Sequence, residues 1–564
     1  TIQTTDFGNA NLFLMNPAGF LFGPNATLNV GGTAAFTSAD YIRLADNMRF
    51  NAIPNAGADA LLSPAPVAAF GFLGSNPGAI TVQGSQFTVT EGHGISLVGG
   101  NIEVTVGTLD DGSVQPARLS APGGQINLAS VASPGEILYP SFQSGPNMNG
   151  QSFTNMGAIT LSEGSILDVS ADAAGTIKIR GGQFVIADAT LSADTVNSNG
   201  ASTAIDINLT GDLSISDTRA APAITARTSG TGNAGEVQIA SANLQATSTD
   251  PDFAPFALID AHSSGEGRAG NVNITTGNLS VQNVVGPFAT WHFTDSGPQA
   301  AGPGGDTTIR AQTMDLTGTT LSTGSLLAEL LGFEPSGPAG NLTFIGDSLH
   351  TSGVLFATTA FVAPIETHHG GNMTMNVREI NMLITQVSTD SWGGRGGISI
   401  NGDTLITDAT VFSTFTAFGP GGGITFDGRI IELTNGSSFL TSTSGGAGAN
   451  AGDIRVNATD HFSLIGISGA NPLGEHNPSG LFTNSFGFVG TQGRSGNVFV
   501  TTPIFTIREG RINTSTTTSG GGGNVTVNAG TVTISGEFPN PAAAEPVYGI
   551  TDLNPSGIFT QTVG

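Results

Sequence analysis

A short phrase of sequence recurs along the chain and restricts the folds that the chain can adopt. The phrase is a small residue, a glycine, a polar residue, and then two apolar residues on either side of a polar one. Four successive copies have glycines spaced 35 residues apart: AGEVQI (234–239), AGNVNI (269–274), GGDTTI (304–309) and AGNLTF (339–344). Looser copies run from GGQINL (123–128) to GGNVTV (522–527). This spacing indicates a repeat architecture in which each unit packs on its neighbours.

The residues between the glycines have the pattern of strands. Apolar and polar residues alternate there, as expected of half-buried strands; one such series is Val272, Ile274, Leu279 and Val281. Each repeat holds three such segments, turned by Gly and Asn residues at corners that need positive φ. The sequence therefore predicts an all-β fold, a three-sided parallel β-helix of about 20 coils in which each coil buries its inner residues against the next.

Several stretches depart from the repeat and are interpreted as loops that project from the coils. They are rich in Pro, Gly or aromatic residues and cover 284–303, 468–479 and 536–550. Helical periodicity is rare, and the best helix candidate is SLLAELLGFE (325–334).

Composition excludes several classes of partner. The net charge is −26, with only 16 Lys and Arg residues, so nucleic acid is a poor partner. The chain has no cysteine, which excludes disulfides and thiolate metal sites.

The apolar run PAPVAAFGFLG (64–74) is shorter than the roughly 20 residues that cross a bilayer, so we expect no membrane span.

An early segment, NLFLMNPAGFLFGPNATLNVGG (11–32), carries far more apolar surface than the repeats. This segment and its continuation to about residue 135 resemble the secretion domain of filamentous-haemagglutinin type exoproteins, the cargo of two-partner secretion in Gram-negative bacteria. The resemblance rests on an Asn-Pro-x-Gly turn followed by an apolar residue, matched by Asn16, Pro17, Gly19 and Phe20. Phe22-Gly23 and the later stretches 78–104 and 117–131 also fit the family.

The resemblance carries several expectations. It implies a right-handed β-helix, export through an outer-membrane barrel transporter, and an adhesin that is secreted or held at the outer cell surface. It divides the chain into a partial secretion domain, 1–135, and a β-helix repeat region, 136–564. Because the capping strands of the family's domain are missing and the last repeat stops midway, we expect the chain to be an excerpt of a longer exoprotein.

Because β-helices also serve as enzymes on polysaccharides, a sequence of this fold class can hold a catalytic pattern. The stretch EGHGIS (91–96) is similar to the histidine motif of pectin-hydrolysing β-helix enzymes. Such hydrolases also need a set of carboxylates, and the only adjacent aspartates, Asp110 and Asp111, follow His93 in an apparent turn. We therefore interpret the GHG sequence as a coil corner and expect no catalytic residues, no cofactor and no metal site. A β-helix enzyme or binding protein that acts on extracellular polysaccharide is the alternative.

Binding to a ligand is expected at projecting loops. PFATWHFTDSG (287–297) places Trp291 and His292 between Pro and Gly, an aromatic cluster able to stack on sugar rings. The same cluster would equally well cover one face of the β-helix. A surface polysaccharide or a cell-surface receptor is the predicted partner of the exoprotein, and this loop is the candidate ligand contact.

Overall fold

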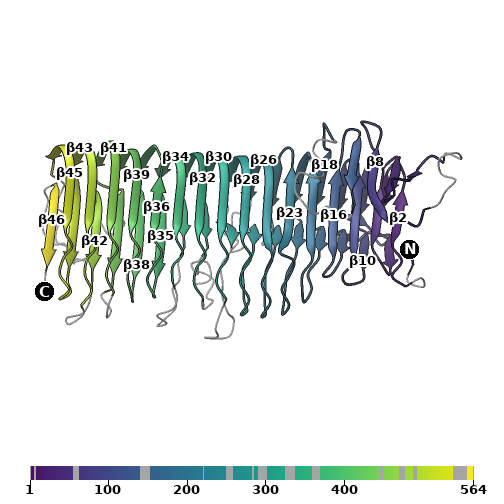
Figure 1. The fold of residues 1–564 in the computed structure, drawn as a ribbon, viewed down its shortest axis with the longest axis horizontal. Coiled ribbons are helices and arrows are strands. Elements are labelled where there is room, and N and C mark those ends of the chain that lie inside the picture. Colours follow the sequence, from purple (N-terminus) through teal and green to yellow (C-terminus); the bar gives the residue numbers. More distant parts are fainter. Residues whose placement is uncertain are drawn as a thin grey trace. The chain divides into compact units, whose positions relative to one another are not determined.

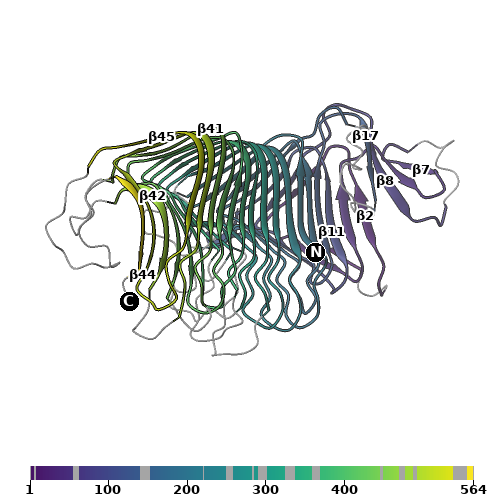
Figure 2. The same ribbon diagram turned by 60° about the vertical axis from the view of Figure 1, so that its left-hand side comes forward.

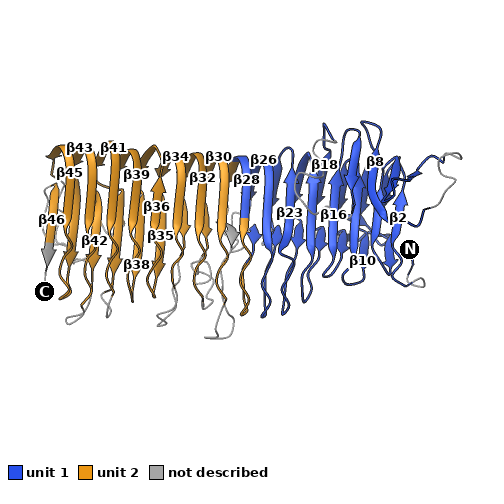
Figure 3. Cartoon of the chain, viewed as in Figure 1, with its two compact units in different colours: residues 1–261, 273–278 blue, residues 262–272, 279–564 orange. Residues whose placement is uncertain are grey.

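The computed structural model describes fourteen segments of the chain, within which all regular elements are β-strands: 2–4, 8–54, 63–139, 153–219, 221–248, 258–282, 285–289, 302–323, 337–358, 369–444, 449–468, 477–486, 492–537 and 556–562. The chain divides into two compact units, residues 1–261 with 273–278 and residues 262–272 with 279–564 (Figure 3). Strand β28 (Val272–Gln282) contributes to both units. In the segments described, no helix is long and apolar enough to cross a membrane.

In unit 1 the chain winds through three faces of parallel strands, with one strand per face in every coil except that of β26 (Figure 1). The first face comprises β2 (Leu12–Met15), β5 (Ala34–Thr37), β11 (Gly94–Gly99), β16 (Gln125–Ser130), β20 (Thr176–Gly181), β23 (Thr203–Leu209) and the start of β26 (Glu236–Ser248). The second face comprises β3 (Phe20–Phe22), β9 (Ile80–Gln83), β12 (Ile102–Thr105), β18 (Ala158–Ser162), β21 (Gln183–Ala187), β24 (Leu213–Asp217) and the end of β26.

The third face of unit 1 closes each coil with a short strand. Its members are β1 (Ile2–Gln3), β4 (Thr27–Val30), β10 (Gln86–Val89), β15 (Arg118–Ser120), β19 (Ile166–Asp168), β22 (Thr190–Ser192), β25 (Ile224–Thr225) and β27 (Ile259–Asp260). Inner residues stack in columns across the coils. One column on the first face contains Leu14, Phe36, Leu97, Leu128 and Ile179.

Unit 2 has the same three faces, but one long strand usually serves the first two of them. These long strands are β30 (Thr307–Thr317), β32 (Leu342–Ser352), β34 (Met373–Leu383), β39 (Ile424–Thr434), β41 (Ile454–Ile465), β43 (Val498–Arg508) and β45 (Val525–Ser535), while β36 (Ile398–Asn401) and β37 (Thr404–Asp408) remain separate. The alternation of buried and exposed residues slips by one position midway along β30, and this slip marks the bend between two faces.

The third face of unit 2 comprises β29 (Val285–Ala289), β31 (Thr320–Ser322), β33 (Leu355–Ala357), β35 (Gln386–Ser391), β38 (Val411–Thr416), β40 (Ser438–Thr443), β42 (Ser479–Ser485), β44 (Gly510–Thr516) and β46 (Gly557–Thr562). The parallel pairing of successive coils confirms the predicted parallel β-helix and its three faces. The predicted helix at 325–334 lies outside the residues that the structure describes, as does most of each predicted loop.

The recurring phrase of the sequence forms two columns in unit 2, and a third column of threonines lies beside them. A Cβ atom on the phrase glycine would lie well within 3.0 Å of the carbonyl oxygen of the glycine one coil earlier, as at Gly305, Gly340, Gly371, Gly452, Gly496 and Gly523. The next residue bonds along the axis, since Asn271 Oδ1 accepts from the Asp306 N–H at 2.9 Å and Asp306 Oδ1 from the Asn341 N–H at 2.9 Å.

The third column consists of buried threonines from the third face. Each threonine hydroxyl donates to the carbonyl oxygen of a phrase glycine at 2.6–2.9 Å; the pairs include Thr323–Gly340, Thr358–Gly371, Thr441–Gly452 and Thr483–Gly496. These bonds tie the third face to the start of the first face within each coil, and they satisfy polar groups that water cannot reach.

A second, smaller sheet lies outside the coils of unit 1 (Figure 2). It is antiparallel, with the order β17 (Gly135–Leu138), β8 (Val67–Phe72), β6 (Tyr41–Leu44) and β7 (Arg49–Asn51). We call it the outer sheet. Its strands enter between the first and second faces, after β5 and after β16. A short hairpin, β13 (Gly107–Thr108) and β14 (Val114–Gln115), projects elsewhere.

Candidate functional site

The Asn-Pro-x-Gly segment forms the corner between β2 and β3. The Gly19 N–H donates to the Asn16 carbonyl at 2.9 Å, which closes a β-turn with Pro17 in the position where its fixed φ is favoured. The Asn16 side chain uses both ends of its amide. Its Oδ1 accepts from the Ala18 N–H at 3.2 Å and its Nδ2 donates to the Gly19 carbonyl at 3.0 Å. Asn16 is therefore the cap of this turn as well as an exposed residue.

The turn packs tightly on the corner of the following coil. Gly19 has φ +94°, and a Cβ atom there would lie well within 3.0 Å of the Ala79 carbonyl oxygen. The Gly78 N–H donates to the Pro17 carbonyl at 3.2 Å, and the Phe20 N–H donates to the Ala79 carbonyl at 2.9 Å. Both the backbone conformation and the space at this corner thus require glycine at position 19.

Phe20 begins an aromatic cluster inside the first coils. Its ring stacks on Phe22 with centroids 5.7 Å apart and meets Phe36 edge-on at 5.9 Å. Phe22 in turn contacts Phe87 of the next coil at 5.0 Å. Leu21, between the two rings, points outward and is 71% exposed. The turn is consequently followed by a strand whose aromatic side chains join the first coil to two faces of the next coil.

The other apolar residues of the opening segment face the outer sheet. Phe13 lies 5.6 Å from the Tyr139 ring and 6.5 Å from the Phe70 ring, and Met15 packs against the same cluster. The buried core between the outer sheet and the first face consists of Ala35, Ala39, Ile42, Phe70, Phe72, Val98, Ala129, Val131, Ile137 and Phe153. The segment is apolar on both sides because it separates two cores.

A network of polar side chains connects strands β17, β6 and β7 of the outer sheet. Glu136 accepts from the Tyr41 hydroxyl at 2.8 Å and from Arg43 Nε at 3.0 Å, and the Arg49 guanidinium lies 4.0 Å from the centre of the Tyr41 ring. Burial, and then the bond to Glu136, raise the pKa of Tyr41 to about 12. Tyr41 is therefore a hydrogen-bond donor at any physiological pH, which suits the Glu136 carboxylate.

The histidine of the EGHGIS stretch occupies a coil corner. Gly92 has φ +80°, and the His93 carbonyl lies where a Cβ atom on Gly124 of the next coil would be. Asp111 belongs to the β13–β14 turn, where its carboxylate accepts from the Ser113 hydroxyl and N–H; these bonds lower its pKa. Across the segments described, no group of three His, Cys, Asp or Glu residues is placed to hold a metal ion.

The sequence of residues 2–179 matches the family model described as the TPS secretion domain. The chain carries a TPS secretion domain. It is accordingly an exoprotein of two-partner secretion, exported across the outer membrane with the help of an outer-membrane partner. Comparison with curated proteins and with solved structures gives no significant match. The match spans all strands from β1 to most of β20 and includes the whole outer sheet.

The structure brings the four predicted motif residues of the TPS domain into one corner, whereas Trp291 and His292 lie outside the described residues. The division of the chain at residue 135 stays a prediction, and the family match runs beyond it. Sequence reasoning missed the outer sheet and its network of Tyr41, Arg43 and Glu136. The apolar run at 64–74, which contains β8, was the available signal for a second core.

Proposed function

We propose that the protein is an adhesin-like structural exoprotein whose Asn16–Phe20 corner acts in export. The observation that carries the proposal is the position of this corner, which joins the first coil, the corner of the next coil at Ala79 and the core beneath the outer sheet. A transporter that releases the chain in an extended form would allow this part to fold as soon as residues up to about Phe153 are outside. The folded domain would then serve as template for the coils that follow.

The physical driving force in this proposal is burial of apolar surface outside the cell. Each added coil places inner residues such as Ile309, Phe344 and Met375 on the column of the coil before. Burial of apolar surface contributes roughly 25 cal/mol per Å². Folding of one coil after another would therefore bias the movement of the chain outward without hydrolysis of a nucleotide.

Export of the full-length protein with its outer-membrane partner tests this proposal. Asn16→Ala removes both bonds of the turn cap, and Gly19→Ala places a methyl group against the Ala79 carbonyl. We expect each variant to lower the amount of protein in the medium by about tenfold or more. Immunoblots of medium and cell fractions measure this effect.

Two matched variants control for general damage. Asn25→Ala changes another exposed turn asparagine, and Gly112→Ala changes another glycine of positive φ, +82°, around which there is open space. Both should be exported close to the wild-type level. Normal export of Asn16→Ala and Gly19→Ala would overturn the role of this corner, while loss of export in all four variants would show that the assay reports fold damage alone.

We further propose that the exoprotein is not an enzyme and acts by binding a surface polysaccharide or a cell-surface receptor. The support is that His93, the best catalytic candidate of the sequence, lies at a coil corner that the adjacent glycine column already explains. The outer face of the coils would then act as a scaffold for contacts with other surfaces. Adhesion of protein-coated beads to cells, with beads coated with an unrelated β-rich protein for comparison, measures this activity.

A further inference from the structure

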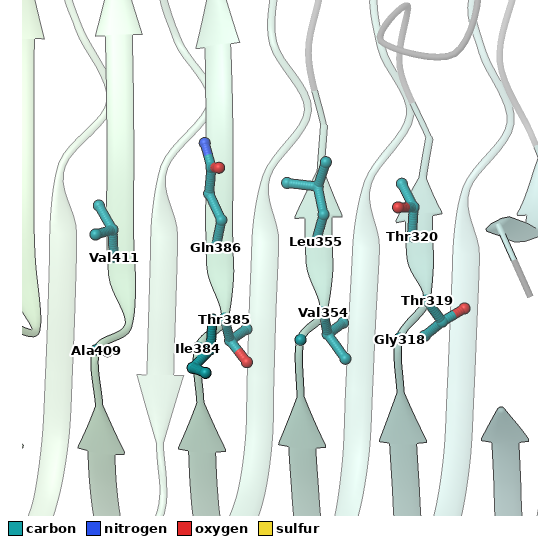
Figure 4. A pocket seen from close by; sticks show the side chains of 11 residues that line it. Gly318, Thr319, Thr320, Val354, Leu355, Ile384, Thr385, Gln386, Ala409 and Val411 are labelled. Atoms are coloured by element: carbon teal, nitrogen blue, oxygen red, sulfur yellow. The ribbon is translucent and has the colours of Figure 1, made fainter. Parts of the chain in front are cut away.

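A groove of about 670 Å³ crosses four successive coils of unit 2, at the corner where the second face turns into the third (Figure 4). Its floor is made by the corner residues Gly318, Gly353 and Ala409, which carry little or no side chain. All three have positive φ, between +49° and +63°. Their N–H groups donate to carbonyls of the next coil at 2.8–3.2 Å, so the floor is a rigid part of the ladder.

Ile384 occupies the same corner position between Gly353 and Ala409, and it is an outlier. Its φ is +48°, a conformation that β-branched residues rarely adopt, and its side chain is 63% exposed. Gly or Asn would suit this backbone better, and an exposed isoleucine adds little to the core. Strain of this kind, held in place by the surrounding ladder, is typical of positions that serve a binding or switching function.

The wall of the groove on the third face alternates in chemistry from coil to coil. Thr320, Leu355, Gln386 and Val411 are in register on neighbouring strands and form one outward column (Figure 4). The hydroxyl of Thr320 and the amide of Gln386 are therefore two coils apart, and so are the aliphatic side chains of Leu355 and Val411. Two coils rise about 9.6 Å along the axis.

The lining of the groove carries no charged side chain. The nearest acidic residue in sequence is Asp408, whose carboxylate accepts from Asn435 Nδ2 at 3.0 Å. The chain as a whole has a net charge of −26, so a polyanion would be repelled. The volume lies in the range of small-ligand sites, which combine apolar walls with a few polar groups.

We propose that this groove binds an unbranched, neutral, β-linked polysaccharide that lies along the β-helix axis, an inference that rests on the proposed binding of a surface polysaccharide. An extended chain of this type presents alternating sugar faces and repeats every second sugar, a distance close to two coils. Its hydroxyls would meet Thr320 and Gln386, and its C–H faces would meet Leu355 and Val411. Ile384 would form the side wall that holds the sugar chain against this column.

Titration of the purified protein with cello- and xylo-oligosaccharides of increasing length tests this inference by calorimetry. We expect binding that strengthens with length until the ligand spans the four coils, and no comparable binding of acidic polysaccharides. Gly353→Asn fills the floor with a side chain that tolerates positive φ, and the site of its Cβ is open space. This variant should weaken binding by at least about tenfold.

Two further variants separate binding from folding. Gly8→Asn makes the same change outside the groove, at a glycine with φ +64° and open space around its Cβ position, and should leave binding unchanged. Ile384→Asn should raise the thermal unfolding temperature because it relieves backbone strain. The same variant should weaken oligosaccharide binding. A residue with a purely structural role would not change stability and binding in opposite directions.

Failure of every neutral oligosaccharide to bind would overturn the proposal, and so would equal affinity for acidic polysaccharides. Oligosaccharide binding by Gly353→Asn with the affinity of the wild-type protein would show that the binding site is not this groove. Self-association of the chain that is abolished by Gly353→Asn would assign the groove to a second copy of the chain instead.

Discussion

At the scale of single residues, the phrase glycines are the positions where the fold tolerates no side chain. We expect Gly340→Ala to lower the free energy of unfolding by about 3 kcal/mol, because its Cβ atom would overlap the Gly305 carbonyl and force two coils apart. Gly74→Ala is the control, since Gly74 has open space around it, and it should be neutral or slightly stabilising. Urea unfolding followed by circular dichroism measures both; equal midpoints for the two variants would contradict this account.

A buried carboxyl group should make stability depend on pH. Burial raises the pKa of Asp390 from its ordinary 3.8 to about 6, although the Ser388 hydroxyl donates to one of its oxygens. A backbone hydrogen bond from Phe415 on the neighbouring strand also lowers this pKa, but burial has the largest effect. Because the folded-state pKa exceeds that of the unfolded chain, this group favours folding at low pH, and that contribution is lost as the pH rises through about 6.

Asp390→Asn should therefore stabilise the protein at pH 7, by roughly 2 kcal/mol, and the gain should shrink as the pH falls toward 4. Urea midpoints of the two proteins across this pH range measure the difference. Asp315→Asn, at an exposed position on β30, is the control and should change stability little. A gain from Asp390→Asn that stays constant across the pH range would show that the charge of Asp390 is not its cause.

At the scale of elements, the sequence was sufficient to predict the strands that pair with a strand of the neighbouring coil. The alternation of Val272, Ile274 and their neighbours, together with the phrase glycines, predicted the coils because each coil repeats the same local requirements. The turn at Asn16–Gly19 was likewise visible, since its residue types are those that a capped turn needs.

The outer sheet could not be predicted in this way, because its pairing is not local. Strand β17 pairs with β8 across more than 60 residues, and Phe13 meets Tyr139 across an even longer interval. No periodic pattern connects such distant strands, and each strand is short enough to resemble one more coil strand. The groove was also missed, since it depends on four corner residues that come together only through the register of the coils.

At the scale of the whole molecule, unit 2 behaves as a stack in which each coil contacts only its neighbours. Its stability should then be a sum of terms for single coils and for the contacts between adjacent coils. Such a stack tolerates the loss of one complete coil, provided that the columns on either side still meet. It does not tolerate the loss of part of a coil, because the faces would then no longer match.

The register of β30, β32 and β34 defines such a deletion. Leu342 pairs with Met373 and Thr307 with Leu342, so removal of residues 341–371 joins Gly340 to Asn372 and brings β30 against β34 in register. We expect this variant to fold with the same strand content and to resist protease as the intact protein does.

Removal of 341–355 alone would bring β33 to the position of the first face and should expose unit 2 to proteolysis. Circular dichroism and limited proteolysis distinguish the two deletions, and equal damage by both would contradict the additive stack. Equal tolerance of both would show that stacking does not depend on matched faces.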